Sequence, residues 1–159
     1  MVKPELHASL AEWRLLLGTW IGVGEGQPGK SKVERTYEAT LEGRYILAQN
    51  QSTYAPQEKN PEGEVHNDIG YYSLDKARKR LVFRQFHVEG FVTQYVASTE
   101  RFDGRTLVLD SELIENIPIG WRARETYQFN GPDAFEEVFE LAEPGKDFEV
   151  YAHNRLRRT

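Results

Sequence analysis

The hydrophobic and polar positions of this chain alternate with a period of two from residue 18 onward, which is the pattern of half-buried β-strands. Turn-forming residues interrupt the alternation roughly every 8 to 14 residues. The pattern predicts about ten strands, near residues 18–26, 31–41, 44–55, 65–74, 80–88, 91–99, 105–114, 118–129, 134–142 and 147–157.

The segment before the first strand has a helical pattern instead. From Pro4 to Leu17 the apolar residues recur at helical spacing, at Leu6, Leu10, Trp13, Leu16 and Leu17. Pro4 is tolerated in a first helical turn, and Gly18 is a typical residue for ending a helix. We therefore expect one short N-terminal helix.

Short turns connect the predicted strands. Four dipeptides, Glu42-Gly43, Glu89-Gly90, Asp103-Gly104 and Asn130-Gly131, supply the positive φ angles that tight hairpins need. Strands joined by such short turns are antiparallel neighbours in space. The longest break, Pro56–Glu64, contains no periodic apolar residue.

Ten antiparallel strands in 159 residues would leave long exposed edges in an open sheet, and closure into a barrel removes those edges. The sequence thus predicts an all-β fold, a closed ten-stranded antiparallel up-and-down β-barrel with a short N-terminal helix, in one domain over residues 1–159. Ten strands enclose more space than the roughly eight whose side chains fill a barrel, so we expect a ligand cavity. The Pro56–Glu64 segment is expected to be a mobile loop over its mouth.

Trp20 stands at the start of the first predicted strand, between Gly18 and Gly22. A large aromatic side chain can plug one end of a barrel, and the glycines let the strand bend and approach other backbone closely. We expect Trp20 to cap the closed end, covered by a guanidinium group from Arg155 or Arg157.

Composition narrows the choice of partner and compartment. The net charge is −5, which gives no positive field for nucleic acid or anionic lipid. Aromatic residues make up 12% of the chain and suit both β-strands and the walls of a cavity. The chain has no cysteine, no signal-peptide pattern and no membrane-spanning apolar run, so we expect a cytoplasmic protein.

Common catalytic motifs are missing. Gly24–Ser31 matches the P-loop formula by letter, but a strand pattern follows it where a helix is required. Neither a Gly-x-Ser-x-Gly elbow nor a His-Glu-x-x-His pair occurs. Four carboxylates on predicted strands could pair for acid–base work, but most such residues face water, and we expect the same of Asp110, Glu125, Glu136 and Glu137.

The four histidines differ in their surroundings. His7 and His66 are expected in solvent, at the helix and beside the long loop. His87 and His153 lie in aromatic stretches, which makes them candidate ligands, although a buried histidine that only forms a structural hydrogen bond is the alternative. The candidate ligand-binding residues are Tyr151, His153, His87, Phe91 and Tyr95.

Three blocks of sequence carry a likeness to a known family. The first block is Gly18–Pro28, with its Gly-x-Trp core. The second runs from Gly70-Tyr71-Tyr72 through Leu81-Val82-Phe83 to His87–Val92, and the third is Tyr151–Arg158. Together they resemble the nitrobindins, a family of haem-binding ten-stranded barrels related in shape to fatty-acid-binding proteins and lipocalins. The resemblance implies a ferric haem in a shallow pocket, held by one histidine of the final strand, and chemistry with nitric oxide or peroxynitrite.

Two arguments give the final strand opposite orientations. In an ungapped comparison Tyr151 falls where the family has its axial histidine, with His153 two residues later on the same face. That comparison turns both toward the cavity as candidate iron ligands, His153 first because imidazole is the commoner haem partner. Hydrophobic alternation instead turns inward the more apolar face, which holds Phe148, Val150, Ala152 and Leu156. The family orientation is our working prediction.

The leading hypothesis is a barrel that binds a small, largely apolar ligand in its cavity, with haem as the named candidate cofactor. An enzyme of the peroxynitrite isomerase or scavenging type is the second hypothesis, and a perturbed acid–base group in the cavity would favour it. The third is an interaction scaffold, which a core filled by side chains would favour.

Overall fold

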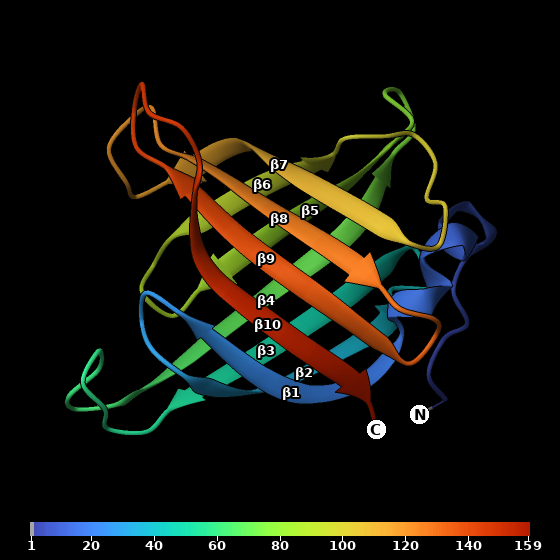
Figure 1. The fold of residues 1–159 in the computed structure, drawn as a ribbon. Helices are drawn as coiled ribbons and strands as arrows, with labels where there is room; N and C mark the ends of the chain where they lie inside the picture. The colour runs from blue at the N-terminus through green and yellow to red at the C-terminus, as the bar shows by residue number, and fades with distance from the viewer. Residues whose placement is uncertain (1) are drawn as a thin grey trace.

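The computed structural model describes residues 2–159 and is a closed barrel of ten antiparallel strands (Figure 1). A short 3₁₀ helix, η1 (Ala8–Leu16), precedes the barrel. The strands are β1 (Gly18–Gly26), β2 (Ser31–Thr40), β3 (Tyr45–Tyr54), β4 (Glu64–Asp75), β5 (Arg80–His87), β6 (Val92–Ala97), β7 (Thr106–Glu115), β8 (Arg122–Phe129), β9 (Ala134–Ala142) and β10 (Glu149–Arg158). Each pairs with its neighbours in sequence, and β1 pairs with β10, which confirms the predicted fold class.

Two predicted boundaries differ from the observed ones for local reasons. The helix begins at Ala8 rather than Pro4, because the His7 side chain accepts a hydrogen bond from the Ser9 backbone N–H and caps it. Strand β8 begins at Arg122 rather than residue 118. The preceding turn contains Asn116 and Gly120 at positive φ, which interrupts the strand conformation.

The helix η1 lies at one end of the barrel (Figure 1), and its buried side chains close that end. Trp20 is fully buried there, and its indole N–H donates to the Leu16 carbonyl oxygen at 2.8 Å. The rings of Phe135 and Phe129 meet the Trp20 ring edge-on, with centroids 4.7 and 6.4 Å away. Trp20 therefore fills the closed end as part of the hydrophobic core.

The cation that covers Trp20 is Arg158, not Arg155 or Arg157 as predicted. The guanidinium carbon of Arg158 lies 4.2 Å from the centroid of the Trp20 ring. The same group donates to the carbonyl oxygens of Leu15 and Leu17. The prediction was wrong because successive residues of β10 face opposite sides: Arg155 and Arg157 are exposed on the outer face, while Arg158 points inward.

The long segment between β3 and β4 stands beside the open end rather than over it (Figure 1). The Gln57 side chain accepts a hydrogen bond from the Lys30 N–H at 2.7 Å and donates to the Lys30 carbonyl oxygen at 2.9 Å. Asn60 donates to the Pro28 carbonyl oxygen at 3.3 Å. The segment is thus tied to the β1–β2 turn, and residues 55–63 do not line the cavity.

The helical content of the described chain is confined to η1. Within residues 2–159, no helix is long and apolar enough to cross a membrane.

Candidate functional site

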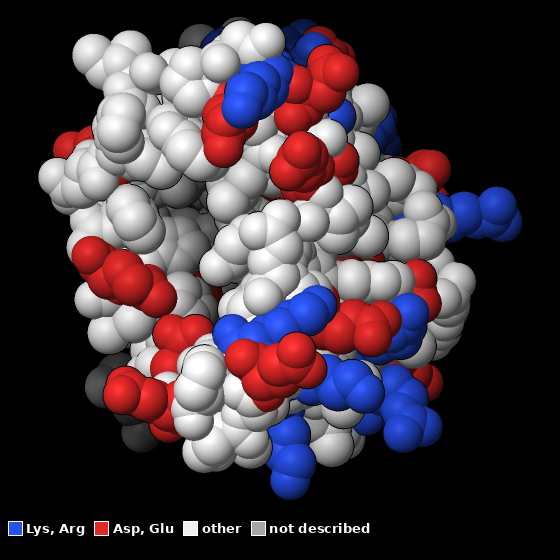
Figure 2. Space-filling view, turned by 60° about the vertical axis from the view of Figure 1, so that its left-hand side comes forward, with Lys and Arg blue, Asp and Glu red and all other residues white. Residues whose placement is uncertain are grey.

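A cavity of about 420 Å³ opens at the end of the barrel opposite η1. Figure 2 turns this end toward the viewer and shows a hollow with acidic side chains beside it. One side of the cavity, here called the apolar wall, consists of Phe91, Ile114, Ile117, Trp121, Phe139, Leu141 and Tyr151. The other, the polar wall, consists of Asn50, Ser52, His66, Asp68, Gln85, His87 and Thr93. Such a cavity suits a largely apolar ligand with a polar edge.

The polar wall arises because inward-facing residues become more polar toward the open end. From closed to open end, the inward residues of β5 are Leu81, Phe83, Gln85 and His87, and those of β4 are Tyr72, Gly70, Asp68 and His66. Strand alternation places every second residue inside whatever its polarity. The same strands therefore build a hydrophobic core at one end and a polar surface at the other.

The floor of the cavity contains a buried ion pair. Arg35 on β2 donates to both carboxylate oxygens of Glu137 on β9, at 2.8 and 2.9 Å. The Asn154 amide donates to Glu137 as well, at 2.8 Å. Burial opposes ionisation of Glu137, but the charge and hydrogen bonds of Arg35 outweigh it and lower the pKa of Glu137. Glu137 is therefore an ionised carboxylate.

Glu125 on β8 is the neutral counterpart of Glu137. Its side chain is buried, and the Tyr127 hydroxyl donates to its Oε2 atom at 2.8 Å. Burial, reinforced by the negative charge of Glu137, raises the pKa of Glu125 to about 8. At neutral pH Glu125 is thus a carboxylic acid that can give a proton to a group in the cavity.

Asp68 organises the polar wall. Its two oxygens accept hydrogen bonds from Gln85 at 2.8 Å and Asn50 at 3.0 Å. Burial disfavours its charge, but hydrogen bonds from His66 and Gln85 lower the pKa of Asp68. A carboxylate only accepts, so Gln85 must turn its NH₂ group to Asp68. This leaves Gln85 Oε1 buried without a hydrogen-bond partner in the described chain, as an acceptor for a ligand donor.

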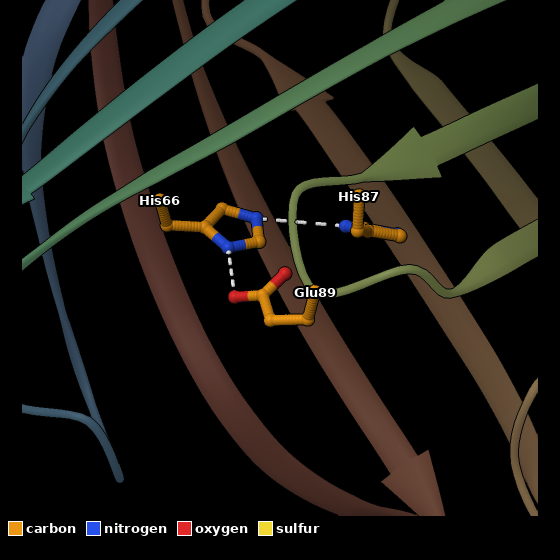
Figure 3. A group of neighbouring side chains, drawn as sticks. All are labelled: His66, His87 and Glu89. Atoms are coloured by element: carbon orange, nitrogen blue, oxygen red, sulfur yellow. Dashed lines mark hydrogen bonds and ion pairs between the residues drawn. The ribbon is translucent and has the colours of Figure 1, made fainter.

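Two histidines and a glutamate lie at the mouth, where β4 begins and β5 ends (Figure 3). His66 Nδ1 is 2.7 Å from Glu89 Oε1, and His66 Nε2 is 3.4 Å from Asp68 Oδ2. Hydrogen bonds to Asp68 and Glu89 raise the pKa of His66 to about 9, whereas burial lowers the pKa of His87. At neutral pH His66 is charged and His87 is a neutral imidazole.

A family profile described as "THAP4-like, heme-binding beta-barrel domain" matches residues 9–158. The chain belongs to this family. A search of curated proteins finds no match. The crystal structure of Rv2717c from M. tuberculosis is similar in fold, with a TM-score of 0.76 and 17% identity over 98% of this chain and 99% of that one. A designed fluorescence-activating β-barrel is a more distant likeness, with a TM-score of 0.49 and 12% identity over 96% of this chain and 100% of that one.

Membership of the THAP4-like family makes the barrel cavity a ligand-binding site. Three of the five residues predicted to bind the ligand line it, namely His87, Phe91 and Tyr151. Tyr95 does not line it, since it is buried against Phe83 with the ring centroids 6.0 Å apart. His66, expected in solvent, is half-buried at the cavity mouth.

His153 points away from the cavity, so its predicted inward orientation is wrong. Its ring nitrogens lie 3.5 Å from Glu136 Oε2 and 3.5 Å from an Arg155 nitrogen, both on the outer surface. Inward positions on this part of β10 belong to Asn154 and Leu156, as hydrophobic alternation indicates. His153 therefore cannot ligate a haem iron from within the cavity, as the nitrobindin resemblance had suggested.

A β-bulge on β10 explains why neither sequence argument succeeds along the whole strand. The pairing of β10 with β9 shifts register between Val150 and Ala152. Tyr151 and Ala152 consequently both line the cavity, while Val150 is exposed. The Tyr151 ring meets Phe139 edge-on, with centroids 5.7 Å apart. The family orientation thus holds for Tyr151 and hydrophobic alternation holds from Ala152 onward.

Sequence reasoning missed the charged floor, because Glu125 and Glu137 were expected to face water. A signal was available in the strand parity. Glu125 shares its face with Ala123 and Tyr127, and all three are buried. A carboxylate between two apolar residues of the same face should have been placed inside the barrel.

Proposed function

We propose that haem is the ligand of this cavity and that His87 binds its iron. Family membership supports haem, and the observation that carries the proposal is that the His87 side chain lines the cavity. Burial lowers the pKa of His87 and so favours its neutral imidazole, the usual histidine form that binds iron. Because the barrel contains an open cavity, a scaffold with a filled core is disfavoured.

The remaining lining residues fit the same ligand. Trp121, Ile117 and Phe139 on the apolar wall offer flat or branched apolar surface to a macrocycle. Tyr151 is the second candidate for iron, but burial raises its pKa and keeps it a phenol at neutral pH. A bound haem would supply the iron chemistry with nitric oxide or peroxynitrite that the nitrobindin resemblance implies.

We also infer a small-molecule partner and a cytoplasmic location. A net charge of −5 favours a small-molecule partner over nucleic acid. The absence of cysteine fits a reducing cytoplasm.

Haemin titration followed by absorption spectroscopy tests the proposal. The wild-type protein should give a Soret band distinct from that of free haemin, with one haem bound per chain. His87→Ala should weaken binding by about tenfold or more and shift the band, while His153→Ala, the matched outer-face control, should leave both unchanged. A wild-type spectrum identical to that of free haemin would overturn haem binding. Unchanged binding in His87→Ala would overturn its role, and a shift in Tyr151→Phe would transfer that role to Tyr151.

Glu125 favours a second function, namely acid–base catalysis of the peroxynitrite isomerase or scavenging type in the cavity. The buried acid with a pKa raised to about 8 is placed to donate a proton to a bound molecule. Glu125→Gln should then slow peroxynitrite conversion by about 100-fold without changing ligand affinity. Glu136→Gln on the outer face of β9 is the control. Equal rates in both variants would exclude Glu125 as the acid.

A further inference from the structure

The side chains of His66, His87 and Glu89 meet at the cavity mouth (Figure 3). His66 comes from the start of β4, His87 is the last residue of β5, and Glu89 lies in the turn that follows. Each offers one ligand atom, and the three atoms lie within 4.8 Å of one another. Two imidazoles and a carboxylate are a donor set typical of zinc and related divalent ions.

The spacing of the imidazole nitrogens fits a shared ion. His66 Nε2 and His87 Nδ1 face each other 3.5 Å apart. Zinc–nitrogen bonds of about 2.0–2.1 Å would span this gap with an angle of roughly 115–120° at the metal, close to the tetrahedral value. We propose that His66, His87 and Glu89 bind one divalent transition-metal ion of the zinc class at the mouth of the barrel. Because His66 is charged at neutral pH, binding would release the proton of its Nε2 atom to solvent.

Neighbouring charges support a cation at this place. Asp68 Oδ2 lies 3.4 Å from His66 Nε2 and is held in position by Asn50 and Gln85. Glu64 also lines this part of the cavity. Asp68 faces the nitrogen that would bind the ion, so both carboxylates would support the site through their negative charge.

The site would leave a coordination position open. All three ligands line the cavity, and a tetrahedral ion held by them would have a fourth position that none of them fills. Water or an anionic group of a ligand would occupy it. A carboxylate whose apolar body lies against Phe91, Ile117 and Trp121 has the matching chemistry.

Zinc binding and haem binding can be measured separately, although both use His87. Zinc binding is measured without haemin, and Glu89 has no part in the proposed haem site. If the protein binds zinc but not haemin, the proposed haem site is wrong and the proposed metal site stands. If it binds haemin but not zinc, the metal site is wrong and the haem site stands.

The test is calorimetric titration of untagged, chelator-treated protein with zinc chloride, paired with cobalt(II) absorption, whose visible bands report tetrahedral coordination. The wild-type chain should bind one ion and develop those bands. His66→Ala and His87→Ala should each lose at least about tenfold in affinity, and Glu89→Gln should lose a similar factor.

His153→Ala is the matched control, because His153 also lies beside a carboxylate, Glu136, but outside the barrel. It should bind zinc like the wild type. Far-UV circular dichroism establishes that each variant is folded, and Glu89→Gln, an exposed turn substitution, provides a test if a histidine variant does not fold. The proposal is overturned if the wild type shows no saturable binding, or if the folded variants bind as tightly as His153→Ala.

Discussion

At the closed end of the barrel aromatic rings pack around Trp20, whereas at the open end histidines and carboxylates surround a cavity. Trp20, Phe129 and Phe135 are fully or almost fully buried and contact one another. At the open end, Glu89 and His66 are partly exposed. The same ten strands build both ends, so the difference lies in which residues occupy the inward positions and in η1, which lies at the closed end. We therefore expect stability to depend mainly on the closed end and ligand binding on the open end.

The largest expected effect is on the closed end. Trp20→Ala should lower the free energy of unfolding by about 3–5 kcal/mol, the usual cost of deleting a buried large aromatic. Trp121→Ala, at the cavity wall, should cost about 1 kcal/mol or less, because Trp121 is only partly buried. Urea denaturation of both variants measures the difference. Similar losses in the two variants would contradict the claim that the closed end contributes most of the stability.

The ion pair on the cavity floor should give the next largest effect at a fixed pH. Arg35→Met leaves the Glu137 carboxylate buried and unpaired, and we expect it to cost about 3 kcal/mol. Adding Glu137→Leu should recover most of that loss, because the uncompensated charge is removed. Denaturation of the single and double variants measures the coupling. A double variant no more stable than Arg35→Met would mean that packing, not charge, sets the cost.

Glu125 should make stability depend on pH. Its pKa is raised from 4.5 to about 8, so between these values the folded chain holds a proton that the unfolded chain has lost. The free energy of unfolding then falls as pH rises, by up to about 1.4 kcal/mol per pH unit. Glu125→Gln should remove this slope, so the stability of the variant relative to the wild type should rise from pH 5 to pH 8. Denaturation across this range, with Glu136→Gln for comparison, checks it, and equal slopes in all three proteins would contradict it.

The smallest predicted effect is a difference in stability between variants of two neighbouring arginines. Arg158→Leu should cost about 1–2 kcal/mol, since it removes the cation over Trp20 and hydrogen bonds to backbone carbonyls. Arg157→Leu, on the exposed face, should change stability by less than about 0.5 kcal/mol. Thermal unfolding of the two variants compares them. A larger loss for Arg157→Leu would favour the original sequence prediction.

The barrel could be predicted from sequence because period-two alternation and glycine turns are local signals. Strand β9, expected at 134–142, is observed at Ala134–Ala142. The cavity was harder to predict from sequence, since its chemistry depends on which polar residues point inward. The bulge at Val150–Ala152 reverses the parity of β10 without any glycine or proline to mark it. His66 and His87 are 21 residues apart and meet only because β4 and β5 pair.

The three tryptophans of the chain allow the most direct test of the proposed binding site. Trp121 lines the cavity, whereas Trp13 and Trp20 are buried in the core, with Trp20 at the closed end. In a ¹H–¹⁵N NMR titration with ferric haemin, whose paramagnetism broadens nearby signals, the Trp121 indole N–H signal should broaden selectively. The Trp13 and Trp20 signals should persist. Broadening of the Trp20 signal with Trp121 unaffected, or no selective change at all, would contradict ligand binding at the open end.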